Sequence, residues 1–192
     1  PRKCQPRARP PLGRRSEYHR RPMSAERFRP SVTVAAIVAH AGRFLLVEEE
    51  TPEGLRLNNP AGHLEQGESP LQGVMREALE ETARVFTPEA LLGVYLSRFT
   101  RPLRGEDVTY LRFAFRGSVG DADPGRALDA GIVRTLWMTP DEIRASCSRH
   151  RSPLVLRCVE DHLAGIRHPL STLVADPSLY APRIEPGGTA AR

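Results

Sequence analysis

The apolar and polar positions of the chain follow two spacings, one typical of strands and one typical of helices. Runs of β-branched and other apolar residues predict five strands, at residues 31–40, 44–48, 91–99, 108–115 and 132–138. The first run is almost wholly apolar, which predicts a buried strand, and the turn 41–43 would join it to the second as a hairpin. Polar stretches predict loops at residues 49–57, 100–107 and 117–131.

Apolar residues three and four positions apart predict a helix over residues 69–84. Ser69 is a natural N-cap, Pro70 would take the first helical position, and Gln72 completes a capping box. The expected apolar stripe consists of Leu71, Val74, Met75, Ala78, Leu79 and Thr82.

Two further helices are predicted after the last strand. One begins with a capping box at Thr139, and the other begins at Ser152 and ends near Gly165. Strands and helices in this order indicate an α/β layered domain. We assign this domain to residues 23–173 and expect a Pro/Gly-rich tail over residues 174–192.

The net charge of +5 is distributed unevenly along the chain. Residues 1–22 hold eight basic residues, one acidic residue and five prolines, which gives them a charge of +7 and leaves −2 for the remainder. Such a stretch cannot build a core, so we expect a disordered, non-native extension with Met23 as the natural start. The alternative is a basic arm that binds an acidic partner. Because the remainder is mildly acidic, we expect no nucleic-acid partner.

The cysteines and the hydropathy of the chain favour a cytoplasmic protein. Cys4, Cys147 and Cys158 lack the spacing of a zinc site or a disulfide framework, which fits a reducing compartment. The longest apolar run, residues 32–39, is too short to span a bilayer, and we find no export signal. We expect no membrane partner and either a monomer or a homodimer.

Three glutamates recur on one side of the predicted helix 69–84. With 3.6 residues per turn, Glu77 and Glu81 nearly superpose, and Glu80 lies beside them, away from the apolar stripe. Carboxylates this close repel one another. A hard cation such as Mg²⁺ or Mn²⁺ prefers oxygen ligands and would relieve this repulsion while it contacts substrate phosphates. The alternative is a glutamate-rich solvent face, which is common on amphipathic helices.

The spacing around these glutamates is more specific than the glutamates alone. The pattern G-x5-E-x7-R-E-x-x-E-E is matched at Gly62, Glu68, Arg76, Glu77, Glu80 and Glu81. This stretch resembles the Nudix box, the signature of the Nudix hydrolase family. The resemblance implies the α/β fold of that family, an α/β/α sandwich with a mixed sheet in which the box forms a loop–helix–loop. It also implies a hydrolase of phosphoanhydride bonds in small phosphorylated substrates.

The resemblance further implies roles for the residues of the box. The implied ligands of Mg²⁺, or of Mn²⁺ in its place, are Glu77, Glu80 and Glu81. The implied catalytic residues are Glu80, Glu81 and Arg76, with one of the two glutamates as the general base. Arg76 would also pair with Glu68 to hold the loop–helix–loop in shape. Gly62, which has no side chain, would let the backbone approach metal and phosphate closely.

Two positions depart from the family pattern at the end of the box. Ala83 stands where glycine is usual, and Arg84 stands where an aliphatic residue is usual. Neither departure removes a ligand, so they bear on the end of the helix and not on the chemistry. We expect Val85 to take the aliphatic role one residue later.

The family often places another carboxylate on a later loop, as a metal ligand or base. In some members, the MutT type among them, it lies six residues before a tryptophan that matches Trp137, and Gly131 occupies that position here. Asp129 is the nearest substitute and our alternative candidate for the base. Glu106 and Asp107 are looser candidates, and each of the three could be a plain loop carboxylate.

A narrower resemblance extends over about residues 28–173. The stretches RPSVTVAAIV, FLLVEE, NNPAGHLE, LRFAF and RSPLV…GIRHPL are similar to those of the NudJ phosphatases within the family. This likeness implies release of orthophosphate from thiamine pyrimidine pyrophosphate, thiamine pyrophosphate and nucleoside di- and triphosphates. The alternatives are a nucleoside triphosphate pyrophosphohydrolase that releases pyrophosphate and a non-catalytic Nudix-fold binding module. The retained carboxylates argue against the binding module.

The candidates for substrate binding are Gly62, His63, Arg98 and Arg112. His63 could touch phosphate or base, or make a structural hydrogen bond. Arg98 and Arg112, with Tyr110, lie on predicted central strands, where an arginine is either a phosphate clamp or a solvated edge residue. We interpret Trp137 as a core residue.

Overall fold

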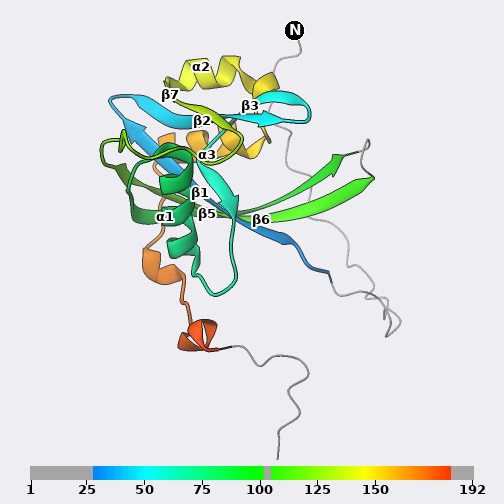
Figure 1. Cartoon of the computed structure of the whole chain (residues 1–192), viewed down its shortest axis with the longest axis vertical. Coiled ribbons are helices and arrows are strands. Elements are labelled where there is room, and N and C mark those ends of the chain that lie inside the picture. The colour runs from blue at the N-terminus through cyan, green and yellow to red at the C-terminus, as the bar shows by residue number, and fades with distance from the viewer. Residues whose placement is uncertain (1–27, 102–104, 183–192) are drawn as a thin grey trace, which may run out of the picture.

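The computed structural model describes residues 28–101 and 105–182, in which strands lie between helices (Figure 1). The strands are β1 (Ser31–His40), β2 (Arg43–Thr51), β3 (Gly54–Asn58), β4 (Ala61–His63), β5 (Phe86–Arg101), β6 (Glu106–Val119) and β7 (Ile132–Met138). The helices are α1 (Pro70–Thr82), α2 (Pro140–Ala145) and α3 (Leu154–Leu163). Short 3-10 helices are η2 (Cys147–Arg149), η3 (Leu170–Thr172) and η4 (Pro177–Tyr180).

The strands form a mixed sheet whose main order is β3-β2-β1-β6-β5. β1 pairs in parallel with β6 and antiparallel with β4, and β2 pairs antiparallel with β3 and β7. The predicted hairpin of β1 and β2 forms, but it is paired only at Ala39↔Phe44 and His40↔Arg43. Beyond these pairs, β1 pairs with β4, and β2 pairs with β3.

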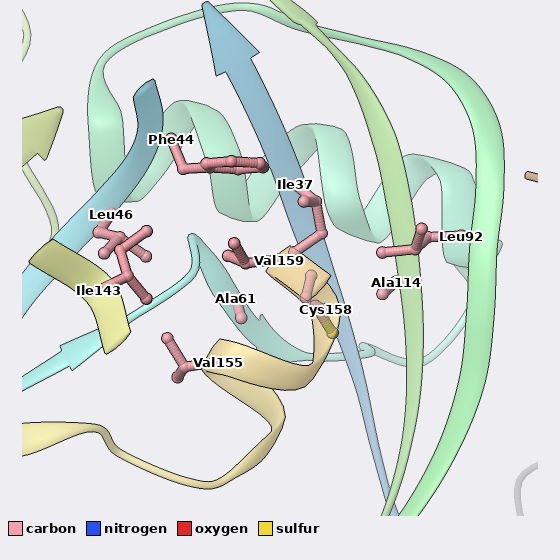
Figure 2. Close-up of a cluster of buried hydrophobic side chains, with 11 residues drawn as sticks. Ile37, Phe44, Leu46, Ala61, Leu92, Ala114, Ile143, Val155, Cys158 and Val159 are labelled. Carbon is pink, nitrogen blue, oxygen red and sulfur yellow. The ribbon is translucent and has the colours of Figure 1, made fainter. Parts of the chain in front are cut away.

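Successive side chains of β1 pack into two different cores, because neighbouring residues of a strand point to opposite faces. Ala35 and Ile37 join the cluster that contains Val155 and Val159 of α3 (Figure 2). The intervening residues Val34, Ala36 and Val38 join the cluster that contains Val74 and Ala78 of α1. All of these side chains are almost fully buried, and each valine or isoleucine contributes roughly 1.5–3 kcal/mol. The α/β/α layering predicted from the sequence is confirmed.

The predicted loops are the part of the fold that the sequence reading placed least well. Residues 49–57 are not a loop, because β2 continues to Thr51, β3 begins at Gly54, and the two strands pair around a turn at Pro52 and Glu53. β3 lies at the end of the strand order, where an exposed face accepts polar residues, so alternation is weak in its sequence. β5 and β6 likewise extend into the predicted loop 100–107, and β6 extends to Val119.

The ends of the chain bear on the predicted domain limits. The extension predicted at residues 1–22 lies outside the described residues. The predicted tail 174–192 includes η4, and there the Tyr180 hydroxyl donates to Oε1 of Gln72 at 3.2 Å. Within residues 28–101 and 105–182, no helix is both long enough and apolar enough to cross a membrane.

Candidate active site

The helix α1 has the start that its sequence predicts and an unusual end. The Ser69 side chain accepts from the backbone N–H of Gln72, and the Gln72 side chain accepts from that of Ser69, so the capping box is complete. The helix ends at Thr82, two residues before the predicted limit, and its C-cap residue Ala83 has a left-handed conformation with φ of 53°. Glycine adopts this conformation without strain, which explains why the family pattern has glycine here.

The two residues after Ala83 do not behave alike. Val85 is 62% exposed, so the expectation that it takes over an aliphatic role is wrong. Arg84 instead donates from Nη1 to the Gly120 carbonyl at 2.8 Å, and its guanidinium carbon lies 6.0 Å from the Trp137 ring centroid. The Trp137 ring packs against the α1 core cluster, as expected of a core residue. Arg84 therefore anchors the end of the helix from the surface.

Arg76 is the centre of the hydrogen bonds of the box. Its Nε and Nη2 donate to the two carboxylate oxygens of Glu68 at 3.1 and 2.7 Å, so the predicted pair forms. Nη2 also donates to the His63 carbonyl at 3.0 Å. Nη1 donates to Oε1 of Glu77 at 2.8 Å and to Oε2 of Glu80 at 3.0 Å. The hydrogen bond from Arg76 lowers the pKa of Glu68, so Arg76 and Glu68 stay ionised and hold the loop against the helix.

Glu77 is packed against Gly62 and is not exposed to solvent. A Cβ atom at Gly62 would lie only 2.1 Å from Oε2 of Glu77, so no other residue fits there without displacing the carboxylate. Burial is the main cause of a raised pKa of Glu77, although Arg76 opposes the shift. The interpretation of these glutamates as a plain solvent face therefore fails for Glu77.

Glu81 is buried at the edge of β4, where its Oε2 accepts from the backbone N–H of Ala61 at 2.7 Å. Burial raises the pKa of Glu81 to about 8, and the negative charges of Glu77, Glu49 and Asp129 contribute to the rise. Such a concentration of negative charge favours a bound cation. Met75, in contrast, is 42% exposed and does not belong to the buried stripe, since the buried arc of α1 turns toward Glu77 and Glu81.

The donors at this site are of the type that Mg²⁺ and Mn²⁺ prefer. Glu77, Glu80 and Glu81 offer carboxylate oxygens, the usual ligands of hard divalent cations. Across the described ranges, no three Asp, Glu, His or Cys side chains are already grouped as a metal cluster. Arg76 takes one oxygen of Glu77 and one of Glu80, which spreads the carboxylates around its guanidinium. The residues fit a divalent cation by their chemistry and by their excess of negative charge.

Of the candidates for an additional base, Asp129 lies nearest to the box. Its backbone N–H donates to the Glu80 carbonyl at 2.9 Å, and its charge acts on Glu81. Asp107 is instead bound to Arg98 on the exposed part of β5 and β6, and this hydrogen bond lowers its pKa. The side chain of Glu106 lies outside the described residues. Gly131, the position of the family's later carboxylate, precedes β7 in a left-handed turn with φ of 92°.

A pocket of about 230 Å³ lies beside β4 and includes all four predicted substrate-binding residues, Gly62, His63, Arg98 and Arg112. His63 and Arg98 are exposed, and Arg98 is paired with Asp107. Arg112 is only 8% exposed, so it is not a solvated edge residue. Burial lowers its pKa, and neither its Nε nor its Nη1 has a hydrogen-bond partner within the described part of the chain.

The sequence reading missed several polar residues of this pocket. Glu49 falls in a predicted loop and Asn58 has no predicted role, yet both line the pocket together with Thr33 and Arg151. The sequence feature that marks this part of the pocket is the pair of asparagines directly before Pro60. In the structure, Asn58 and Asn59 are both buried, although asparagine is mostly exposed in proteins.

Comparison with known proteins shows what this chain is similar to. The NUDIX domain family model matches residues 27–157. Phosphatase NudJ of Escherichia coli (strain K12) is 33% identical over 146 residues, which cover 76% of this chain and 92% of that protein. The structure of a NUDIX hydrolase from Nitrosomonas europaea is 51% identical, with a TM-score of 0.70, over 77% of this chain and 98% of that one. A MutT NUDIX hydrolase from Burkholderia pseudomallei, 18% identical with a TM-score of 0.57 over 70% of this chain and 98% of that one, shares the fold.

Proposed function

The chain belongs to the Nudix family of hydrolases, which act on phosphoanhydride bonds of small phosphorylated substrates, and from this premise we propose that it is a metal-dependent phosphatase. The proposed reaction releases orthophosphate and leaves a product that is one phosphate shorter. The proposed substrates are thiamine pyrimidine pyrophosphate, thiamine pyrophosphate, and nucleoside di- and triphosphates. The likeness to phosphatase NudJ over most of both chains favours this reaction.

One observation carries the proposal: two box glutamates, Glu77 and Glu81, are buried beside β4. Glu77 lies against Gly62, Glu81 accepts from Ala61, and the pKa of Glu81 is raised to about 8. Buried carboxylates without enough cationic partners destabilise a protein. Their retention is expected where they bind a ligand, which here would be a cation together with substrate phosphate.

The proposed metal ligands are Glu77, Glu80 and Glu81, with Mg²⁺ as the metal and Mn²⁺ as a substitute. When bound, such a cation neutralises phosphate charge, polarises the phosphoryl group and lowers the pKa of an attacking water. Arg76 orients the carboxylates of Glu77 and Glu80 through its hydrogen bonds. Because Gly62 has no side chain, the Glu77 carboxylate can lie directly against β4.

The base in this proposal is one of Glu80 and Glu81, with Asp129 as the alternative. Glu81 has its Oε2 held by Ala61, so a proton from water would go to Oε1. A base is most effective when its pKa lies near the working pH. Asp129 reaches the same region from the loop before β7, through its contact with the Glu80 backbone.

The test is a screen of orthophosphate release across the proposed substrates, with Mg²⁺ and with a chelator in excess. We expect release from thiamine pyrophosphate, its pyrimidine precursor and common nucleotides, and no release with the chelator. A protein that binds these compounds and hydrolyses none of them would be a binding module, and the proposal would be wrong.

A further inference from the structure

The pocket beside β4 lies on the face of the strand opposite Glu77, and the charge of its residue Glu49 acts on Glu81. His63, Thr33 and Arg112 are paired side by side across β4, β1 and β6, so their side chains share one face of the sheet. Gly62, between Ala61 and His63, is directed to the other face, toward Glu77. In the proposed function the phosphate chain lies at the glutamates. The organic group of the substrate would then extend past β4, which is only three residues long, into this pocket.

The floor of the pocket contains an unusual number of buried polar atoms without partners. Across residues 28–101 and 105–182, no hydrogen bond is made by Nε and Nη1 of Arg112, Oε1 of Glu49, Oδ1 of Asn58 or Oγ1 of Thr33. All four residues line the pocket, and Arg112 is more than nine-tenths buried. Buried polar groups in folded proteins are almost always paired, so this cluster indicates groups reserved for a ligand.

The charges of these groups favour a neutral ligand with both donors and acceptors. Arg112 presents N–H donors, whereas Glu49 presents the acceptor Oε1. The Glu49 carboxylate is compensated only in part, by a side-chain hydrogen bond with Asn58 and by Nε of Arg151 at 3.7 Å. A phosphate would be attracted by Arg112 but repelled by Glu49. An edge that carries an N–H donor beside a nitrogen or oxygen acceptor would satisfy both residues at once.

The walls of the pocket favour a flat ring. The rings of His63 and Tyr110 line it together, with their centroids 6.3 Å apart and a 46° angle between their planes. The pocket has a volume of about 230 Å³. A planar heterocycle therefore fits this space.

We propose that Glu49 and Arg112 are specificity-determining residues that bind the edge of a nitrogen heterocycle in the organic group of the substrate. Glu49 accepts from an amino or ring N–H of the heterocycle, and Arg112 donates to an adjacent ring nitrogen or carbonyl oxygen. Asn58 lies beside them and binds the same edge. This inference rests on the proposed function for the position of the phosphate chain, and it concerns binding and not the chemical step.

The first test measures binding without metal or phosphate. The probe is an aminopyrimidine that carries a hydroxymethyl group, and benzyl alcohol serves as a ring of equal size without nitrogen. Calorimetry or ligand-observed NMR of the whole chain should detect the aminopyrimidine and much weaker binding of benzyl alcohol. Equal binding of the two compounds would overturn the proposal, because the polar edge would then contribute nothing.

The variants are Glu49→Gln, which keeps the size but places an N–H donor where an acceptor is needed, and Arg112→Met, which keeps the length without donors. Each should weaken binding of the aminopyrimidine about tenfold or more, the range for one hydrogen bond to a charged group. The matched controls are Glu50→Gln, an exposed neighbour on β2, and Arg116→Met, on β6 outside the pocket lining. If Arg112→Met fails to fold, Glu49→Gln alone decides.

A kinetic comparison separates this inference from the proposed function. We expect Glu49→Gln to lower the ratio of kcat/KM for an aminopyrimidine diphosphate to that for inorganic triphosphate, which has no ring, mainly by raising KM. Orthophosphate release with an unchanged ratio would contradict the inference and leave the proposed function standing. If the aminopyrimidine binds through its polar edge but no substrate releases phosphate, the result would contradict the proposed function and support the pocket assignment.

Discussion

Glu81 combines burial, a hydrogen bond from the backbone and three neighbouring negative charges in one side chain. Arg76 forms ion pairs with Glu68, Glu77 and Glu80, whereas in the described part of the chain it forms none with Glu81. Glu81 therefore depends on a bound cation more than the other box glutamates do. This difference makes single substitutions at and around Glu81 informative.

We expect Glu81→Gln to reduce turnover by about two to four orders of magnitude at saturating Mg²⁺, as for the loss of a catalytic base. The amide keeps the shape of the side chain, so the melting temperature should change little. Asp129→Asn should have a smaller effect on turnover. The matched control is Glu65→Gln, which alters an exposed carboxylate of the box loop. A loss in Asp129→Asn as large as that in Glu81→Gln would make Asp129 the base.

Gly62→Ala should damage the site by displacement. The added Cβ would lie 2.1 Å from Oε2 of Glu77, so the carboxylate or β4 must move, and we expect a loss of stability of about 1–3 kcal/mol with a marked loss of turnover. Gly120→Ala is the control, because a Cβ there meets nothing within 4 Å and no left-handed φ is required. Denaturant unfolding and turnover measurements should distinguish the two variants. Equal stability and turnover would show that the site accommodates a Cβ at residue 62 without displacing Glu77.

Among the elements, α1 ends on a strained residue, because Ala83 has a left-handed conformation that favours glycine. A left-handed conformation costs a residue with a Cβ about 1–2 kcal/mol, and glycine at position 83 would remove this cost. The substitution would also remove the buried Ala83 methyl group, which offsets about 0.8 kcal/mol of the gain in stability. Ala83→Gly should therefore raise the free energy of unfolding by up to about 1 kcal/mol. Ala78→Gly, within the same helix, should lower it. A less stable Ala83→Gly variant would mean that the methyl contact outweighs the backbone strain.

The strands β2 and β7 and the segment η2 are joined through Glu48. Its buried carboxylate accepts from Nε of Arg134 at 2.7 Å and from Arg149, and the hydrogen bond with Arg134 is the main cause of its lowered pKa. A lowered folded-state pKa stabilises the protein above the unfolded-state pKa of 4.5, and this stabilisation is lost as the pH falls through the folded-state pKa.

Glu48→Gln should therefore lower the free energy of unfolding near neutral pH, because the hydrogen bonds from both arginines lose their charged acceptor. We expect a loss of only about 1–3 kcal/mol, since solvent screens the two partly exposed arginines. The difference from the parent chain should shrink as the pH falls below 4.5. Glu50→Gln on the same strand should show no such pH-dependent difference. Urea unfolding across this pH range measures the effect, and a constant difference at every pH would refute a role for the charge of Glu48.

The domain as a whole shows which features follow from local sequence and which depend on tertiary contacts. The capping box of α1 and the pairing of Arg76 with Glu68 were predictable, because both are fixed by spacing within a short segment. The hairpin of β2 and β3 was missed, because edge strands carry polar residues that resemble a loop. The burial of Glu81 could not be predicted, because it depends on β4 reaching the helix.

The pocket was predictable only in part for the same reason. His63, Arg98 and Arg112 were identified as candidates from their positions near the box or on predicted strands. Glu49 and Asn58 reach the pocket because β2 and β3 diverge from β1 after a two-pair hairpin, a bend that no local pattern announces. The polar floor of the pocket therefore becomes visible only once the strands are assembled.

In the whole domain, the box glutamates lie on the α1 side of β4 and the pocket lies beside the same strand. The proposed reaction removes the outer phosphate of the substrate. The decisive measurement follows a nucleoside triphosphate through one turnover with Mg²⁺ by ³¹P NMR, with and without added inorganic pyrophosphatase. We predict orthophosphate and a nucleoside diphosphate as the first products, in equal amounts and independent of pyrophosphatase. Pyrophosphate and a nucleoside monophosphate, with orthophosphate only after pyrophosphatase is added, would show that the inner bond is cleaved and would contradict the account.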